Sequence, residues 1–167
     1  MKLDLRDIIQ VPGGRIPFEF QMDLTQMEFY GQRPMAEPIA VSGVVRNMAG
    51  ALVLEGTASS RLHLTCDRCG KPFLREKTVP LDTLLATRLE NGESDDIVLL
   101  DGTVLDLDEL AQTEFILAMD TKNLCSEDCK GLCPRCGADL NLGPCGCTPE
   151  TDPRWAALTQ LLDDSGR

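Results

Sequence analysis

The sequence predicts an α+β protein: a mainly antiparallel sheet with one helix, then a cysteine-rich module and a short C-terminal helix. Two observations carry this prediction. Apolar and polar residues alternate with a period of two through much of the first half of the chain, which is typical of half-buried strands. Six of the eight cysteines then fall within residues 124–147, after a segment with the spacing of an amphipathic helix.

The first half of the chain predicts three strands. Apolar residues alternate through residues 15–24, which indicates a half-buried strand. Prolines and charges in residues 32–38 indicate a loop. Residues 39–48 and 51–66 then face each other across a two-residue turn, as in a long hairpin. The second strand of this hairpin delivers the first cysteine pair at its end.

Residues 73–89 predict a returning strand, in which Pro80 indicates an edge position or a break. A polar loop over residues 91–96 and a short extended piece over residues 96–107 follow it. The extended piece contains an Asp-Gly turn. It leads into the predicted helix.

That helix begins after Asp106, because Asp106 and Glu109 have the spacing of an N-cap and its N3 partner. Its broad apolar face consists of Leu107, Leu110, Ala111, Phe115, Leu117 and Ala118. Near the end of the chain, Asp152 as N-cap and Pro153 at the first helical position predict the short C-terminal helix. Its apolar stripe is Trp155, Leu158 and Leu162.

The cysteines indicate metal binding. They form four closely spaced pairs: Cys66/Cys69, Cys125/Cys129, Cys133/Cys136 and Cys145/Cys147. No apolar run approaches the roughly 18 residues of a membrane span, and no signal-peptide core is evident, so a cytoplasmic protein is the simplest interpretation. In a reducing compartment such spacings favour metal ligands over disulfides. Eight thiolates make two closed zinc sites, although iron would fit the same ligands.

Two groupings of the pairs are open. The sequence favours Cys66, Cys69, Cys125 and Cys129 around one ion and Cys133, Cys136, Cys145 and Cys147 around another, since the second site then closes within fifteen residues. The alternative is a cross-braced arrangement, which joins the first pair with the third and the second with the fourth. Either grouping predicts a β-rich domain with one helix over residues 1–120. Residues 121–167 are expected to form a zinc module and a C-terminal helix, packed on the turn that carries Cys66 and Cys69.

Charge is unevenly distributed along the chain. Of the net charge of −11, residues 90–128 contribute twelve acidic residues and a single base, so the remainder is neutral. Basic residues gather near the cysteines: Arg61, Arg68, Lys71, Arg75, Lys77, Lys130 and Arg135. These cations are the candidate nucleic-acid contacts. Several of these cations could instead partly neutralise the negative charge of the four-thiolate sites.

No catalytic motif is evident. The chain lacks H-E-x-x-H, G-x-S-x-G, a phosphate-binding glycine loop and G-x-G-x-x-G. The only histidine, His63, alternates between Leu62 and Leu64 on a strand, where a packed or surface role is commoner than that of a base. Closed sites also leave no open metal position. The sequence therefore predicts a metal-stabilised binding protein rather than an enzyme, with a C-x-x-C redox protein as the alternative.

Three stretches carry a family resemblance: "LTCDRCGKPF", "DGTVLDLDELAQTEFILAMDTKNLCSEDCKGLCPRCGADLNLGPCGC" and "DPRWAALTQLL". In this order they resemble the YceD-like family of large ribosomal RNA accumulation proteins, over roughly residues 39–163. The resemblance implies a cytoplasmic, non-enzymatic factor that supports synthesis, processing or accumulation of large-subunit (23S) ribosomal RNA and ribosome assembly. It also implies that the second cysteine site is an elaboration, since not every branch of the family retains the full C-terminal set.

Two hypotheses about partners follow. In the first, the basic surface beside the cysteines contacts phosphates of the ribosomal RNA precursor or of assembly intermediates, with strong salt dependence. The acidic residues 90–128 then point away from the RNA. In the second, the acidic segment holds a basic ribosomal protein or assembly factor, and the effect on RNA is indirect. Neither hypothesis involves a membrane.

Overall fold

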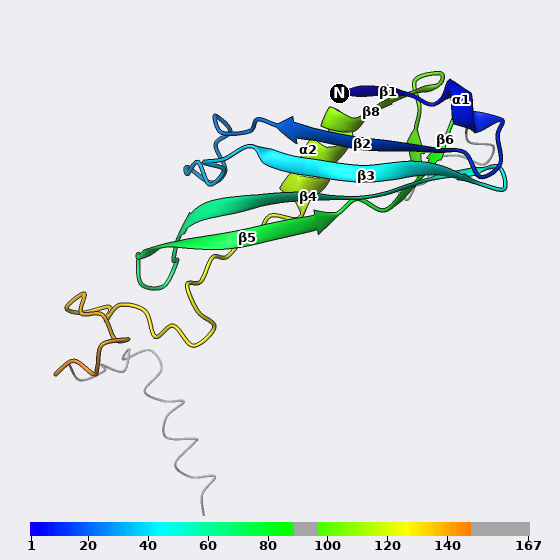
Figure 1. The fold of residues 1–167 in the computed structure, drawn as a ribbon. Helices are drawn as coiled ribbons and strands as arrows, with labels where there is room; N and C mark the ends of the chain where they lie inside the picture. The colour runs from blue at the N-terminus through cyan, green and yellow to red at the C-terminus, as the bar shows by residue number, and fades with distance from the viewer. Residues whose placement is uncertain (89–96, 148–167) are drawn as a thin grey trace, which may run out of the picture.

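The computed structural model describes residues 1–88 and 97–147 (Figure 1). The strands are β1 (Lys2–Asp4), β2 (Arg15–Met22), β3 (Ile39–Met48), β4 (Ala51–Thr65), β5 (Pro72–Pro80), β6 (Thr83–Ala86), β7 (Ile97–Leu99) and β8 (Val104–Asp106), and the helices are α1 (Arg6–Ile9) and α2 (Leu107–Leu117). The mainly antiparallel α+β class is the one that the sequence predicts. The expected polar loop over residues 91–96 and the expected C-terminal helix lie outside the described residues.

Strand β4 is the strand on which the larger sheet is built. Along one edge it pairs antiparallel with β3, which in turn pairs with β2. Along the other edge, residues 52–54 pair with β6 and residues 57–65 pair with β5. The predicted return strand over residues 73–89 is therefore two strands, separated after Pro80, where the sequence indicated a break. Strand β7 extends the sheet beyond β6 in the parallel direction.

Helix α2 packs into the same hydrophobic core as the sheet, behind β2 and β3 in the view of Figure 1. It begins as predicted, because the Asp106 carboxylate accepts from the backbone N–H groups of Asp108 and Glu109. Three of its apolar residues, Leu107, Ala111 and Phe115, are completely buried. The prediction for Leu117 is wrong: its side chain is 75% exposed, because it lies in the last turn at the margin of the apolar face.

The N-terminal segment closes over the start of α2, which the sequence analysis did not anticipate. Strand β1 pairs antiparallel with β8, and the Leu107 backbone N–H donates to the Met1 carbonyl. Leu5, between β1 and α1, is fully buried in the main core. These elements are too short for a periodic pattern to reveal them.

Asn47, near the end of the β3–β4 hairpin, links this N-terminal segment to the sheet. Its side chain is 2% exposed. The amide nitrogen donates to the carbonyls of Ile8 (2.7 Å) and Ile9 (2.8 Å), and the amide oxygen accepts from the Gly50 backbone N–H (2.8 Å). One buried amide therefore forms hydrogen bonds with backbone groups at the end of α1 and in the hairpin turn. Such bonds matter because a buried carbonyl without a hydrogen-bond donor lowers the stability of the fold.

We expect Asn47→Ala to lower the free energy of unfolding by about 2–3 kcal/mol, because it removes the side-chain partner of the Ile9 carbonyl and the Gly50 N–H and one of the hydrogen bonds to the Ile8 carbonyl. Ser42→Ala, an exposed position on the same strand, is the matched control and should change it by less than about 0.5 kcal/mol. Urea unfolding followed by circular dichroism measures both. Equal losses in the two variants would contradict this role for Asn47.

Candidate metal centres

The first cysteine tetrad joins two segments that are far apart in the sequence. Cys66 and Cys69 lie in the turn between β4 and β5, whereas Cys125 and Cys129 follow α2 (Figure 1). Two of the sulfur–sulfur distances are 3.8 and 3.7 Å, and all four sulfurs lie within 4.8 Å of one another. Four thiolates at about 2.3 Å from a tetrahedral zinc ion lie about 3.8 Å from each other, so this donor set fits one ion.

The β4–β5 turn has the hydrogen bonds of a metal knuckle. The Cys66 N–H donates to the Lys71 carbonyl (2.9 Å), and the Gly70 N–H donates to the Cys66 carbonyl (2.8 Å). Gly70 has a φ of 69°, which favours glycine directly after the second cysteine. The Cys125 N–H, followed by those of Cys69 and Arg68, lowers the pKa of the Cys66 thiol to about 6. One thiolate of the tetrad therefore forms readily near neutral pH.

The second tetrad repeats this geometry within the C-terminal segment. Cys133, Cys136, Cys145 and Cys147 place their sulfurs within 4.8 Å of one another. The Cys133 N–H donates to the Ala138 carbonyl (2.8 Å), and the Gly137 N–H donates back to the Cys133 carbonyl (2.9 Å). Backbone N–H groups of Cys136 and Arg135 lower the pKa of Cys133 to about 6. A hydrogen bond with Cys136 raises the pKa of Cys147 to about 12, so metal binding there must displace a proton.

The two groups of sulfurs are those that the sequence analysis favours. The cross-braced alternative is not the arrangement in the structure. Among the described residues, both tetrads are positioned to hold a metal ion, and together they use all eight cysteines of the chain. A four-thiolate tetrad with no open position is typical of a structural site rather than a catalytic one.

Ion pairs attach the start of the cysteine segment to the sheet. Arg75 and Lys77 on β5 both contact the Asp120 carboxylate, at 3.3 and 3.4 Å. Arg75 also donates to the Leu124 carbonyl at 2.6 Å and lies over the Phe73 ring. These contacts hold the chain between α2 and Cys125 against β5, so they help to bring the two halves of the first tetrad together.

Further contacts hold residues 129–139 against the β4–β5 turn. Arg68 donates to the Cys129 carbonyl at 2.7 Å, and its own carbonyl accepts from the Leu132 N–H at 3.1 Å. A Cβ on Gly131 would lie 2.9 Å from the same Arg68 carbonyl, so only glycine allows this approach. Lys71 forms an ion pair with Asp139 at 2.6 Å, which holds the pKa of that carboxyl below its usual value.

Asn141, from the second tetrad's loop, forms hydrogen bonds with residues 129 and 130 beside the first tetrad. Its side-chain amide donates toward the Cys129 sulfur at 3.6 Å, while its oxygen accepts from the Lys130 N–H at 2.8 Å. A hydrogen bond to a metal-bound sulfur stabilises the thiolate form. Sequence reasoning missed Asn141, Asp120 and Asp139, because their partners come from other turns and strands and no local pattern marks them.

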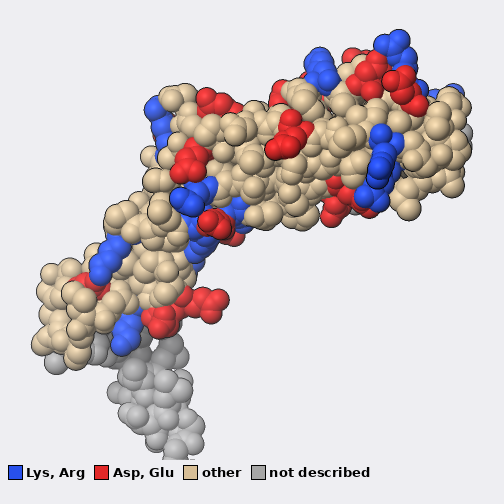
Figure 2. Space-filling model, viewed as in Figure 1, with Lys and Arg blue, Asp and Glu red and all other residues tan. Residues whose placement is uncertain are grey.

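Most of the seven candidate nucleic-acid contacts already have partners within the protein. Arg61 pairs with Glu76 at 3.5 Å, Arg68, Lys71, Arg75 and Lys77 make the contacts described above, and Arg135 has an interaction as well. Lys130 and Arg135 are exposed on the cysteine segment. On the face shown in Figure 2, basic side chains lie beside acidic ones, including at the junction between the sheet and the cysteine segment.

The fold and the two tetrads define an α+β protein with two four-cysteine sites suited to metal. The profile of the family described as "Large ribosomal RNA subunit accumulation protein YceD" matches residues 54–162, which include every cysteine. The chain belongs to this family, as the sequence resemblance indicates.

The curated relatives are mycobacterial. Uncharacterised proteins of Mycobacterium tuberculosis and Mycobacterium bovis are 29% identical over 122 residues, which is 71% of this chain and 59% of theirs. An uncharacterised protein of Mycobacterium leprae is 28% identical over 130 residues, 75% of this chain. The chain thus spans about 59% of the length of these relatives. No solved structure matches it. Neither helix within residues 1–88 and 97–147 has the length and apolar character that a membrane crossing needs.

We expect the purified protein to contain two metal equivalents per chain, one for each tetrad. The double variant Cys136→Ser/Cys147→Ser should retain one equivalent, and Cys69→Ser/Cys125→Ser should also retain one, because the tetrads share no sulfur. Each variant is the control for the other. Metal content is measured by plasma mass spectrometry, and loss of both equivalents in either variant would contradict two separate sites.

We expect Arg75→Ala to loosen the attachment of residues 120–124, since it removes both the Asp120 ion pair and the Leu124 hydrogen bond. The loss of stability should be about 1–3 kcal/mol, the range for a hydrogen bond that involves a charged group. Arg61→Ala is the matched control: its pair with Glu76 is exposed, and such pairs contribute about 0–1 kcal/mol. Hydrogen exchange of residues 120–124 should accelerate only in Arg75→Ala. Unchanged exchange there would contradict the docking role.

Proposed function

We propose that the protein is a non-enzymatic, zinc-stabilised factor that supports the synthesis, processing or accumulation of large-subunit (23S) ribosomal RNA during ribosome assembly in the cytoplasm. The observation that carries this proposal is the family match over residues 54–162, which spans both tetrads and most of β4. The family description names accumulation of the large ribosomal RNA. The ribosomal RNA precursor and its assembly intermediates are the partners in this proposal.

Zinc is the proposed ion for both tetrads. Four thiolates with tetrahedral spacing suit zinc, which has no redox chemistry and builds closed structural sites. Such sites would stabilise the fold of residues 125–147, which supply two sulfurs to the first tetrad and all four to the second. Iron takes the same ligands, and absorption in the visible range distinguishes the two ions.

The proposed absence of catalysis rests on the positions of the residues that could act in a reaction, the eight cysteines and His63. The described structure gathers all eight cysteines in two closed tetrads. His63 lies exposed on β4, and its backbone N–H donates to the Pro34 carbonyl. A C-x-x-C redox role would need the two sulfurs of one motif to form a disulfide, and this would withdraw two of the four ligands from a tetrad.

A second candidate, an acidic binding protein for a basic ribosomal protein, is favoured by the charge arrangement. Direct RNA contact through Arg61, Arg68, Lys71, Arg75, Lys77, Lys130 and Arg135 stays a prediction. Most of these cations are engaged in intramolecular contacts. A phosphate that displaces the carboxylate partners of Arg61, Lys71, Arg75 and Lys77 gains less than one that meets a free cation. The effect on ribosomal RNA would then pass through a protein partner.

Sedimentation of the tagged protein from growing cells tests the main proposal. We expect the protein to co-migrate with large-subunit precursors at low salt, because both charged partners and RNA phosphates attract complementary surfaces. Depletion of the protein should lower large-subunit RNA relative to small-subunit RNA. The variant Cys69→Ser/Cys125→Ser should fail to restore it, whereas Ser42→Ala should restore it fully. Protein found only at the top of the gradient, with an unchanged RNA ratio on depletion, would contradict the proposal.

A further inference from the structure

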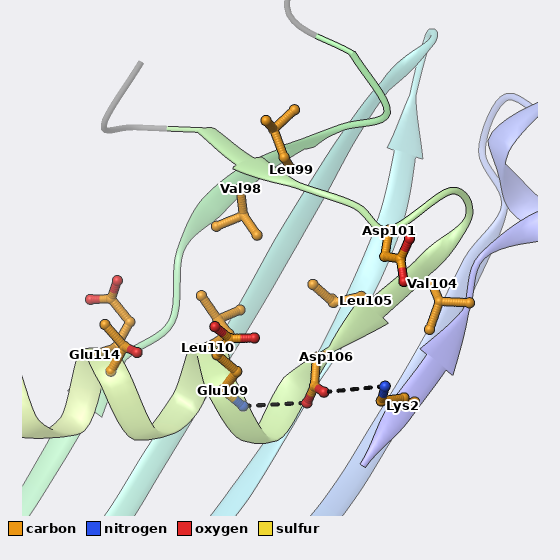
Figure 3. A pocket seen from close by; sticks show the side chains of 11 residues that line it. Lys2, Val98, Leu99, Asp101, Val104, Leu105, Asp106, Glu109, Leu110 and Glu114 are labelled. Carbon is orange, nitrogen blue, oxygen red and sulfur yellow. Dashed lines mark hydrogen bonds and ion pairs between the residues drawn. The ribbon is translucent and has the colours of Figure 1, made fainter. Parts of the chain in front are cut away.

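A groove of about 320 Å³ lies between β7, β8 and α2 (Figure 3). We call it the β7–α2 groove. Its apolar floor includes Val98 on β7, Leu105 on β8 and Leu110 on α2. Leu105 and Leu110 are anchored in the main core, with 2% and 8% exposure, whereas Val98 is only partly buried. The groove therefore has an apolar floor whose residues pack in or against the main core.

Carboxylates surround this floor. Asp101, Glu109 and Glu114 line the groove, and none of them forms an ion pair within residues 1–88 and 97–147. Lys2 is the cation in the lining; it contacts Asp106 at 3.8 Å and is 73% exposed. The groove therefore carries a net negative charge. This contrasts with the surface beside the cysteines, where acids and bases are paired.

The chemistry of the groove selects among possible occupants. RNA is disfavoured, because phosphates and unpaired carboxylates repel each other at short range. A bound metal ion is disfavoured too, since among the described residues only the cysteine tetrads gather three or more ligand atoms within 4.8 Å. A ligand that brings cations to the rim and an apolar side chain to the floor complements both features.

We propose that the β7–α2 groove binds a segment of a protein partner rich in lysine and arginine, with one apolar side chain of the segment inserted between Val98 and Leu110. Its cations lie against Asp101, Glu109 and Glu114. The identification of the partner as a protein of the ribosome rests on the proposed function. Segments of this composition neutralise phosphates in RNA-binding proteins, and occupancy of the groove would shield them from premature contact with RNA.

The test uses full-length protein and labelled peptides. The first is Lys-Arg-Lys-Leu-Arg-Lys-Arg, and the second replaces its central leucine with serine. We expect the leucine peptide to bind and Glu109→Gln/Glu114→Gln to weaken it about tenfold, which corresponds to about 0.7 kcal/mol for each exposed charge pair. Glu19→Gln/Glu28→Gln removes the same charge at exposed positions outside the groove. It should change the affinity less than about twofold, because those exposed charges do not line the groove and are screened by salt.

The apolar contact is tested separately. Val98→Thr keeps the shape of the side chain but adds a hydroxyl, so it should weaken the leucine peptide and leave the serine peptide unchanged. Circular dichroism confirms that each variant is folded. Equal weakening by the groove and control charge variants, or equal binding of the two peptides, would overturn the proposal. So would a single-stranded RNA probe that competes for the groove.

The groove and the proposed function fail in different ways. If wild-type protein and Glu109→Gln/Glu114→Gln co-migrate equally with large-subunit precursors, the groove does not hold the partner, while the proposed function stands. If wild-type protein does not co-migrate, the proposed function fails, and the peptide measurements alone decide whether the groove binds a basic segment. Co-migration of wild type and the control, but not of the groove variant, is the result we expect.

Discussion

The placement of the cysteine segment against the sheet depends on the convergence of four thiol groups from two distant segments. Cys66 and Cys69 hold their sulfurs within 4.8 Å of those of Cys125 and Cys129. Thiolates at this distance repel one another unless a cation lies between them. A shared ion would turn that repulsion into a link between the β4–β5 turn and the segment after α2. The second tetrad then packs on a base that is already fixed.

The need to hold these two segments together also explains the positions of four basic residues. Arg68, Lys71, Arg75 and Lys77 contact carbonyls or carboxylates of the cysteine segment and its approach. They hold the segment against the sheet. Asp101, Glu109 and Glu114 form no ion pair within residues 1–88 and 97–147, and they line an apolar groove. Within the described residues, the structure thus separates a cysteine end with paired charges from a groove lined by carboxylates without ion pairs.

Sequence patterns predicted the parts of this architecture that local chemistry dictates. The β3–β4 hairpin, the Asp106 cap and the grouping of the cysteines follow from periodicity, capping and spacing. Patterns did not reveal Asn47 or the pairing of Asp120 with β5, because those contacts join residues that only the finished fold brings together. The parallel pairing of β6 with β7 is likewise a tertiary choice. Leu117 shows the limit of a helical wheel, which places a residue on a face without saying where the core ends.

X-ray absorption at the zinc edge of the protein as isolated tests the central claim most directly, because it reports the ligand atoms themselves. We expect a shell of four sulfur atoms at about 2.3 Å around the metal, averaged over both tetrads. A shell that includes nitrogen or oxygen, or one with fewer than four sulfurs, would contradict two closed four-thiolate sites. It would also remove the link by which the cysteine segment is held to the sheet.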